Sequence, residues 1–219
     1  MELKIDLKYG QDHLSFTVPS GAVIPEFSEP DYEISRESFT RDLLQSLPVD
    51  KARYRQVAIV VSDKTRLCGY PEFLPWLTEV LQQRGAEKEN ISFFIAYCTH
   101  PRQTEAESLR SYGENYHVFR FVHHDCRDES VFSLLGTTRR GTPVMARKDI
   151  LNSSLILTFG SISHHYFAGY GGGRKLFFPG LGFRKAIYHN HGLFLDRETR
   201  SLAAGCQPGK LAGNPLAED

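Results

Sequence analysis

The sequence carries no excess of either charge, because its 26 Lys and Arg residues are matched by 26 Asp and Glu residues. A surface that binds nucleic acid generally shows as a basic excess, so we expect no nucleic-acid partner. No apolar run approaches the roughly 20 residues of a membrane-spanning helix, so we expect no membrane span. Residues 1–10 lack the apolar core of a secretory signal, which favours a cytoplasmic protein.

Several fingerprint motifs are missing as well. The cysteines at 68, 98, 126 and 206 form no C-x-x-C pair and no zinc-knuckle spacing, so we interpret them as free thiols in a reducing compartment. The glycine run near residue 172 ends in "RKL" instead of Gly-Lys-Ser/Thr, which excludes a Walker A loop. A Rossmann fingerprint is excluded too, because its glycines belong directly after the first strand.

The first part of the chain predicts a hairpin and an arm. Residues 3–18 alternate with a period of two around residues 10–12, which is typical of a β-hairpin. Residues 21–32 contain prolines and little periodicity, which indicates an extended arm. A helix is expected at 37–47, where the apolar side chains fall on one face.

The remainder predicts strands that alternate with helices. Apolar runs rich in β-branched and aromatic residues are typical of strands buried on both faces, and they occur at 56–62, 91–99, 116–125 and 155–159. Helical patterns occupy 71–86 and 104–113, with Thr104 as an N-cap. This order predicts an α/β fold with a mainly parallel twisted sheet and helices on both faces.

Polar and reactive side chains follow each predicted strand. Sheets of this kind bind ligands beyond the carboxyl ends of their strands, so these side chains predict a site at one edge of the sheet. They are Asp63, Thr65 and Arg66 after the first strand, His100 after the second, His123, His124 and Asp125 after the third, and the segment from Ser161 onward after the fourth.

A glycine-rich segment and a lysine stand out after the fourth strand. Glycines let backbone N–H groups approach a phosphate closely, which makes Gly169, Gly171, Gly172 and Gly173 candidates for holding a ligand. Lys175 follows them and precedes the apolar run "LFFPG", where partial desolvation would make its amine a nucleophile. A mobile surface turn and a solvent-facing lysine are the alternatives.

Three histidines bracket the lysine. His165 precedes it, and His189 and His191 follow; these last two share a face on a strand and diverge on a helix. Together with His100, two imidazoles from separate loops could act as base and acid on opposite faces of one carbon.

Two polar clusters admit more than one interpretation. Arg66 can hold a carboxylate or phosphate through paired hydrogen bonds, whereas Ser62 or Asp63 could cap the following turn, which does not exclude ligand binding. His123, His124 and Asp125 could coordinate a metal, but structural hydrogen bonding is favoured for them.

Five segments of the sequence resemble the lactate racemase family, whose enzymes use a nickel-pincer nucleotide. They are "SDKTR" at Ser62, "THPRQTEAE" at Thr99, "HHDC" at His123, and "HHYFAGYGGGRKLFFPG" followed by "HNHG". The resemblance implies a single N-terminal α/β domain over 1–219, with the hairpin and arm at 1–35 and a cofactor-binding core at 36–219. It also implies a closing C-terminal domain that this chain lacks.

The resemblance also implies roles for individual residues. Lys175 would be joined covalently to the cofactor, and His191 would bind the nickel, whose other ligands come from the cofactor. His100 and His165 would be catalytic, and Arg66 would hold the substrate carboxylate. The residues implied to hold the nucleotide are Asp63, Thr65, Gly169, Gly171, Gly172 and Gly173.

The activity implied by the resemblance is racemisation or epimerisation of a small-molecule 2-hydroxy acid. One histidine would take the hydroxyl proton while hydride moves to the lysine-linked cofactor, and the flat 2-keto acid would accept hydride on its other face. Enzymes that synthesise the cofactor would be upstream partners. The oligomeric state is not indicated.

Two other functions remain open on the residues alone. Lys175 could form a Schiff base with pyridoxal phosphate (PLP), with the glycines holding the phosphate. The chain could instead be a nucleotide-binding module that has the fold but no turnover.

Overall fold

The computed structural model describes residues 3–9, 12–25, 32–66 and 68–219, which fall into two units divided between Ile34 and Ser35. In the first unit, β1 (Lys4–Tyr9) and β2 (Asp12–Thr17) pair antiparallel, which confirms the predicted hairpin. Its turn at 10–11 and half of the predicted arm, 26–31, lie outside the described residues.

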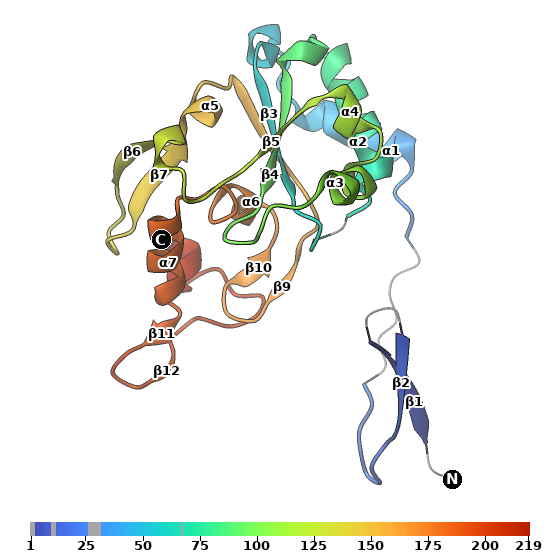
Figure 1. Cartoon of the computed structure of the whole chain (residues 1–219), viewed down its shortest axis with the longest axis vertical. Helices are drawn as coiled ribbons and strands as arrows, with labels where there is room; N and C mark the ends of the chain where they lie inside the picture. The colour runs from blue at the N-terminus through green and yellow to red at the C-terminus, as the bar shows by residue number, and fades with distance from the viewer. Residues whose placement is uncertain (1–2, 10–11, 26–31, 67) are drawn as a thin grey trace. The chain divides into compact units, whose positions relative to one another are not determined.

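The second unit is built on a four-stranded parallel sheet in the order β5-β4-β3-β8 (Figure 1). The strands are β3 (Val57–Ser62), β4 (Ile91–Ala96), β5 (Arg120–His123) and β8 (Leu155–Phe159). Every residue of β3 is buried, as expected for a central strand covered on both faces. The predicted α/β fold with a parallel sheet is therefore confirmed.

Helices cover both faces of this sheet (Figure 1). On one face Ile59 and Val61 face the larger core, to which α1 (Arg36–Ser46), α2 (Tyr70–Gln83) and α3 (Glu105–Tyr112) contribute. On the other face Ala58 and Val60 pack with residues of α5 (Lys148–Leu151) and α6 (Arg174–Phe177). The N-cap at Thr104 is confirmed, and Glu107 completes a capping box with it.

The prediction of a strand over 116–125 is wrong at its beginning. Gly113, at a φ of 62°, ends α3, and the chain then makes one more helical turn, α4 (Asn115–Val118). Tyr116 packs its ring 5.0 Å from Phe121, and Phe119 lies against the same aromatic cluster. The backbone is extended only over β5. In the residues before β5 the aromatic side chains pack into the cluster from a helical turn, so tertiary packing overrides the alternating pattern there.

The remaining elements were not predicted from the sequence. The longest is α7 (Arg184–Gly192), and two antiparallel pairs lie beside the sheet: β6 (Phe132–Thr137) with β7 (Pro143–Arg147), and β9 (Ser163–His165) with β10 (Gly169–Gly171). Short elements complete the chain: η1 (Lys51–Tyr54), η2 (Lys88–Asn90), η3 (Glu129–Val131), β11 (Leu195–Asp196), β12 (Ser201–Leu202) and α8 (Pro215–Glu218). In the part of the chain that the structure describes, no helix has the length and apolarity needed to cross a bilayer.

Candidate active site

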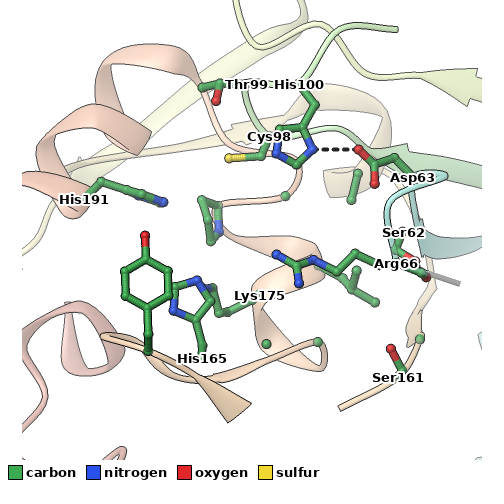
Figure 2. Close-up of a pocket in the computed structure, with 18 of the residues that line it drawn as sticks. Ser62, Asp63, Arg66, Cys98, Thr99, His100, Ser161, His165, Lys175 and His191 are labelled. Carbon is green, nitrogen blue, oxygen red and sulfur yellow. Dashed lines mark hydrogen bonds and ion pairs between the residues drawn. The ribbon is translucent and has the colours of Figure 1, made fainter. Parts of the chain in front are cut away.

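A cavity of about 240 Å³ lies at the carboxyl edge of the sheet. It is lined by residues from the ends of β3, β4 and β8, from the β9–β10 hairpin, and from α6 and α7. Figure 2 shows the labelled side chains of the cavity turned toward a common space. The predicted site residues that line it are Asp63, Arg66, His100, His165, Gly171, Gly172, Lys175 and His191.

Asp63 and His100 form a pair across the ends of two neighbouring strands. Asp63 is buried, and its Oδ2 lies 2.7 Å from Nδ1 of His100 (Figure 2). Since an ionised carboxylate only accepts hydrogen bonds, Nδ1 of His100 carries the hydrogen and donates it. The Nε2 nitrogen of His100 is left for a ligand in the cavity.

The turn after β3 fixes Asp63 in this position. Oδ1 of Asp63 accepts hydrogen bonds from the Thr65 backbone N–H at 3.0 Å and from the Thr65 hydroxyl at 2.6 Å. Thr65 itself does not line the cavity. Asp63 thus caps a turn, as one sequence interpretation held, and orients His100 at the same time, while Arg66 lines the cavity with its side chain.

The glycine segment allows close backbone packing beside the cavity. At Gly172 the φ is +75°, and a Cβ there would lie 1.9 Å from the backbone oxygen of Ser161. At Gly169 the φ is +78°, and a Cβ would lie 2.3 Å from the backbone oxygen of Lys210. Gly171 and Gly172 line the cavity, whereas Gly169 and Gly173 do not. The segment is therefore a tightly packed bend, not the open surface turn of the alternative interpretation.

Replacing Gly172 with alanine is expected to destabilise the fold by about 3 kcal/mol, because the new Cβ meets backbone at a positive φ. Thermal unfolding of the apo chain measures the effect. Gly192→Ala is the matched control, since its Cβ would meet nothing within 4 Å and its φ is not positive. Equal melting temperatures for the two variants would contradict this account of the bend.

Lys175 is the second residue of α6, which follows this bend directly, and its side chain lines the cavity (Figure 2). Burial lowers the pKa of Lys175 to about 8, and the nearby charges of Arg174 and Arg66 act in the same direction. About a tenth of the amine is therefore uncharged at pH 7, far more than for a lysine of ordinary pKa, which agrees with the prediction of a partly desolvated nucleophile.

His165, at the end of β9, is held by its neighbours in the hairpin. Its ring stacks on Tyr166 at 4.9 Å between centroids, and its Nδ1 accepts a hydrogen bond from the Ala168 backbone N–H at 3.3 Å. Burial lowers the pKa of His165 to about 4, with further lowering by Lys175 and Arg66. The ring is therefore neutral near pH 7, with its hydrogen on Nε2.

The two histidines of "HNHG" diverge, because this segment is the last turn of helix α7. His191 lines the cavity, and its buried Nδ1 has no hydrogen-bond partner of ordinary geometry among the described residues. Burial, followed by the charge of Lys175, lowers the pKa of His191. His189 lies away from the cavity, with its Nδ1 2.8 Å from the Thr142 hydroxyl oxygen.

The two histidines at the end of β5, His123 and His124, do not join the site. His123 lies between the hydroxyls of Tyr97, at 2.8 Å, and Tyr116, at 3.0 Å. His124 is buried, with its Nε2 3.0 Å from the Gly182 carbonyl oxygen. The favoured interpretation of structural hydrogen bonding is confirmed. Among the described residues, no three His, Cys, Asp or Glu side chains are grouped so that they could hold a metal ion by themselves.

Sequence reasoning missed several side chains of the cavity lining, among them Cys98 and Tyr166. Cys98 lines it from the end of β4, with the unusual φ of 55° for a residue that is not glycine. Tyr166 lines it beside His165. A signal was present for each, because Cys98 lies at the end of the predicted strand 91–99 and Tyr166 directly follows a candidate histidine.

This set of groups can bind an anion and move protons. Arg66 offers a guanidinium, His100 presents an Nε2 without hydrogen when neutral, and His165 presents an Nε2–H. Lys175 and His191 add a nucleophilic amine and a buried imidazole with an unused nitrogen.

Comparison with known proteins places this arrangement in a family. The lactate racemase N-terminal domain model matches residues 9–202. Lactate racemase of Thermoanaerobacterium thermosaccharolyticum is 28% identical over 227 residues, which cover 98% of this chain and 52% of the relative. Lactate racemase of Lactiplantibacillus plantarum is 30% identical over 165 residues, which cover 74% of this chain and 37% of the relative.

Solved structures agree in fold. The lactate racemase apoprotein of Thermoanaerobacterium thermosaccharolyticum has a TM-score of 0.80 at 24% identity, over 99% of this chain and 52% of that one. A Thermotoga maritima protein has a TM-score of 0.63 at 18% identity, over 87% of this chain and 47% of that one. The chain thus spans about half the length, or less, of the relatives it matches. By the match of the family model over most of its length, the chain belongs to the lactate racemase N-terminal domain family.

Proposed function

We propose that the chain is the cofactor-binding, N-terminal part of a racemase or epimerase that acts on 2-hydroxy acids. The observation that carries the proposal is the convergence of Lys175, His191, His100 and His165 on one cavity, with Arg66 beside them. Two curated relatives are named lactate racemase, which supports this reaction class.

The residues present fit the nickel-pincer nucleotide. Lys175 offers a half-buried amine with a pKa of about 8 for covalent attachment, and His191 offers an imidazole that lines the same cavity for the metal. The backbone of Gly171 and Gly172 lines the same cavity and would lie against the nucleotide. When bound, the group supplies the nickel ion and a carbon that accepts hydride.

The two histidines would handle the hydroxyl proton of the substrate. Direct removal of the proton on the α carbon is unfavourable, because the adjacent carboxylate is already an anion. The hydroxyl proton is a more accessible target, and neutral His100 can accept it at Nε2 while Asp63 stabilises the charged ring. His165 presents its Nε2–H as a hydrogen-bond donor to the substrate oxygen, and the proton taken up by His100 returns to the hydroxyl of the product.

Arg66 would bind the substrate carboxylate. Its guanidinium can form two parallel hydrogen bonds with a carboxylate, which fixes both the position and the orientation of the acid. Its charge also favours the neutral forms of the lysine and of His165, because it lowers the pKa of both Lys175 and His165. One side chain thus serves both substrate binding and the protonation state of the site.

The proposal is tested by producing the protein with enzymes that synthesise the cofactor, followed by intact-mass and peptide analysis. A covalent mass addition on Lys175, with about one nickel per chain, is the expected result. A chain of bare mass under conditions in which a known lactate racemase is loaded would overturn it. Racemisation of 2-hydroxy acids is then measured on the protein in its full natural length.

The lowered pKa of Lys175 would also suit a Schiff-base lysine, so the same preparation is treated with borohydride and pyridoxal phosphate. Mass added to Lys175 only in this second treatment would favour the PLP alternative. Nucleotide binding without turnover in the full-length protein would favour the binding-module alternative.

Asp63→Asn is expected to lower kcat by about 100-fold, because the amide cannot stabilise the protonated ring of His100. Turnover of both enantiomers by the loaded protein measures it. Asp125→Asn is the matched control, since Asp125 is exposed and accepts a backbone hydrogen bond from Arg127 in a turn outside the cavity. Equal losses in the two variants would contradict a role of Asp63 through His100.

A further inference from the structure

The helix that carries His191 is held from outside the cavity by a cluster of polar side chains. Asp219 is at its centre and accepts hydrogen bonds from the hydroxyls of Thr138 at 2.7 Å and Thr142 at 2.5 Å. It also accepts one from the amide nitrogen of Asn190 at 3.0 Å, and His189 adjoins Thr142. We refer to these five residues as the Asp219 anchor.

The hydrogen bonds of the Asp219 anchor have a defined direction. The Thr142 hydroxyl has one hydrogen, which it donates to Asp219, so Nδ1–H of His189 must donate to the Thr142 oxygen. Thr142 also donates its backbone N–H to the Thr138 hydroxyl oxygen at 3.0 Å. The anchor therefore joins the β6–β7 turn, α7 and the segment containing α8 through one carboxylate.

Asn190 sets the rotation of α7 about its axis. It is buried, and its amide group donates both to Asp219 and to the Leu216 carbonyl at 3.2 Å. Consecutive residues of an α-helix point about 100° apart, so a fixed Asn190 determines the direction of His191. The other end of α7 is held by the Arg184 N–H, which donates to the Cys126 carbonyl at 2.8 Å.

The ring of His191 has little else to orient it. Its Nδ1 has no hydrogen-bond partner of ordinary geometry among the described residues, although the Ile187 backbone one turn earlier interacts with the ring and partly opposes the lowering of its pKa by burial. Phe167 contacts the ring edge-on with centroids 6.2 Å apart. A ligand histidine generally has its second nitrogen fixed by a hydrogen bond, which sets the ring orientation. For His191, the position of the α7 backbone therefore determines more of the ring orientation.

We propose that Asp219 and Asn190 are positioning residues that hold α7 so that His191 points into the cavity. The inference rests on the proposed function for its consequence, because a displaced His191 would hold the metal of the cofactor poorly. The hydrogen bonds of Asp219 and Asn190 position α7 in the chain without cofactor as well.

The test compares Asn190→Asp, Asp219→Asn and the reciprocal double variant that carries both changes. The first variant removes the amide donors and sets two carboxylates against each other. The second turns the central carboxylate into an amide. The double variant restores one amide-to-carboxylate contact in reverse. Asp128→Asn is the matched control, because Asp128 accepts hydrogen bonds from the Ser130 hydroxyl and N–H at a site away from α7.

Two measurements are made on the apo protein. Amide exchange over residues 184–192 is expected to rise about tenfold in each single variant, as the loss of a hydrogen bond to a charged group predicts. The side-chain NMR signal of His191 is expected to broaden or split in the same variants. The double variant should exchange more slowly than either single variant, and the control should match the natural protein.

Unchanged exchange in both single variants, or a double variant that exchanges faster than either, would overturn the inference. A global loss of stability is recognised because exchange would then rise in β3 as well as in α7. The loaded protein provides the functional consequence: the single variants should retain less nickel per chain than the double variant. If the natural chain takes up no cofactor, the proposed function fails while the exchange data still decide on the anchor.

Discussion

Lys175→Ala is expected to leave the protein at its bare mass and without racemase activity when it is produced together with the cofactor-making enzymes. The alanine removes the amine that lines the cavity beside His191. Lys175→Arg should fail in the same way, because a guanidinium keeps a positive charge at this place and is not a nucleophile. The loss of turnover should reach the detection limit, since the cofactor would not be retained.

The attachment should also depend on pH in a direction set by the amine. Burial lowers the pKa of Lys175 to about 8, so the uncharged, reactive form increases as pH rises and is nearly complete above about pH 9. The initial rate of mass gain in a reconstitution series from pH 6 to 10 should therefore level off near this value. If the pKa of Lys175 were that of an ordinary lysine, the rate of mass gain would still increase at pH 10.

Lys185→Ala is the control for both measurements. Lys185 is exposed on the first turn of α7 and does not line the cavity, so its loss removes the same charge without touching the site. Mass addition should remain complete in this variant. Mass addition that persists in Lys175→Ala would transfer the attachment to another residue and contradict the assignment.

The buried strands and the edge at which the site forms were predictable from the sequence. The uniformly apolar run that became β3 requires cover on both faces, and a parallel sheet then brings the ends of its strands together. Asp63, His100 and Ser161 follow three different strands, and all three line the cavity. Local pattern and topology were sufficient here because each polar segment directly follows a strand.

Contacts between segments could not be predicted from the same patterns. The pairing of Asp63 with His100 depends on the turn in which Thr65 holds the carboxylate, and no periodicity reports such a turn. The divergence of His189 and His191 became decidable only once the segment proved to be helical. The Asp219 anchor joins parts of the chain about 80 residues apart, and its members are ordinary polar residues in sequence.

His100→Ala and His165→Ala are each expected to lower the racemisation rate by about 10²- to 10⁴-fold in the loaded, full-length protein. The loss should affect both enantiomers, since the group that takes the proton in one direction must return it in the other. His100 and His165 carry their hydrogen on different ring nitrogens, so neither histidine can replace the other. His100 presents a bare Nε2 because Asp63 holds its Nδ1–H, whereas His165 presents Nε2–H because Ala168 donates to its Nδ1.

The pH dependence separates the two histidines further. Burial and the charges of Lys175 and Arg66 lower the pKa of His165 to about 4, so its neutral form persists through mildly acid solution. The pH profile of kcat/KM above about pH 5 should therefore have the same shape in His165→Ala as in the natural protein. His117→Ala is the control, because His117 is exposed on α4 and lies outside the cavity lining. Full activity in either cavity variant would remove that histidine from the catalytic machinery.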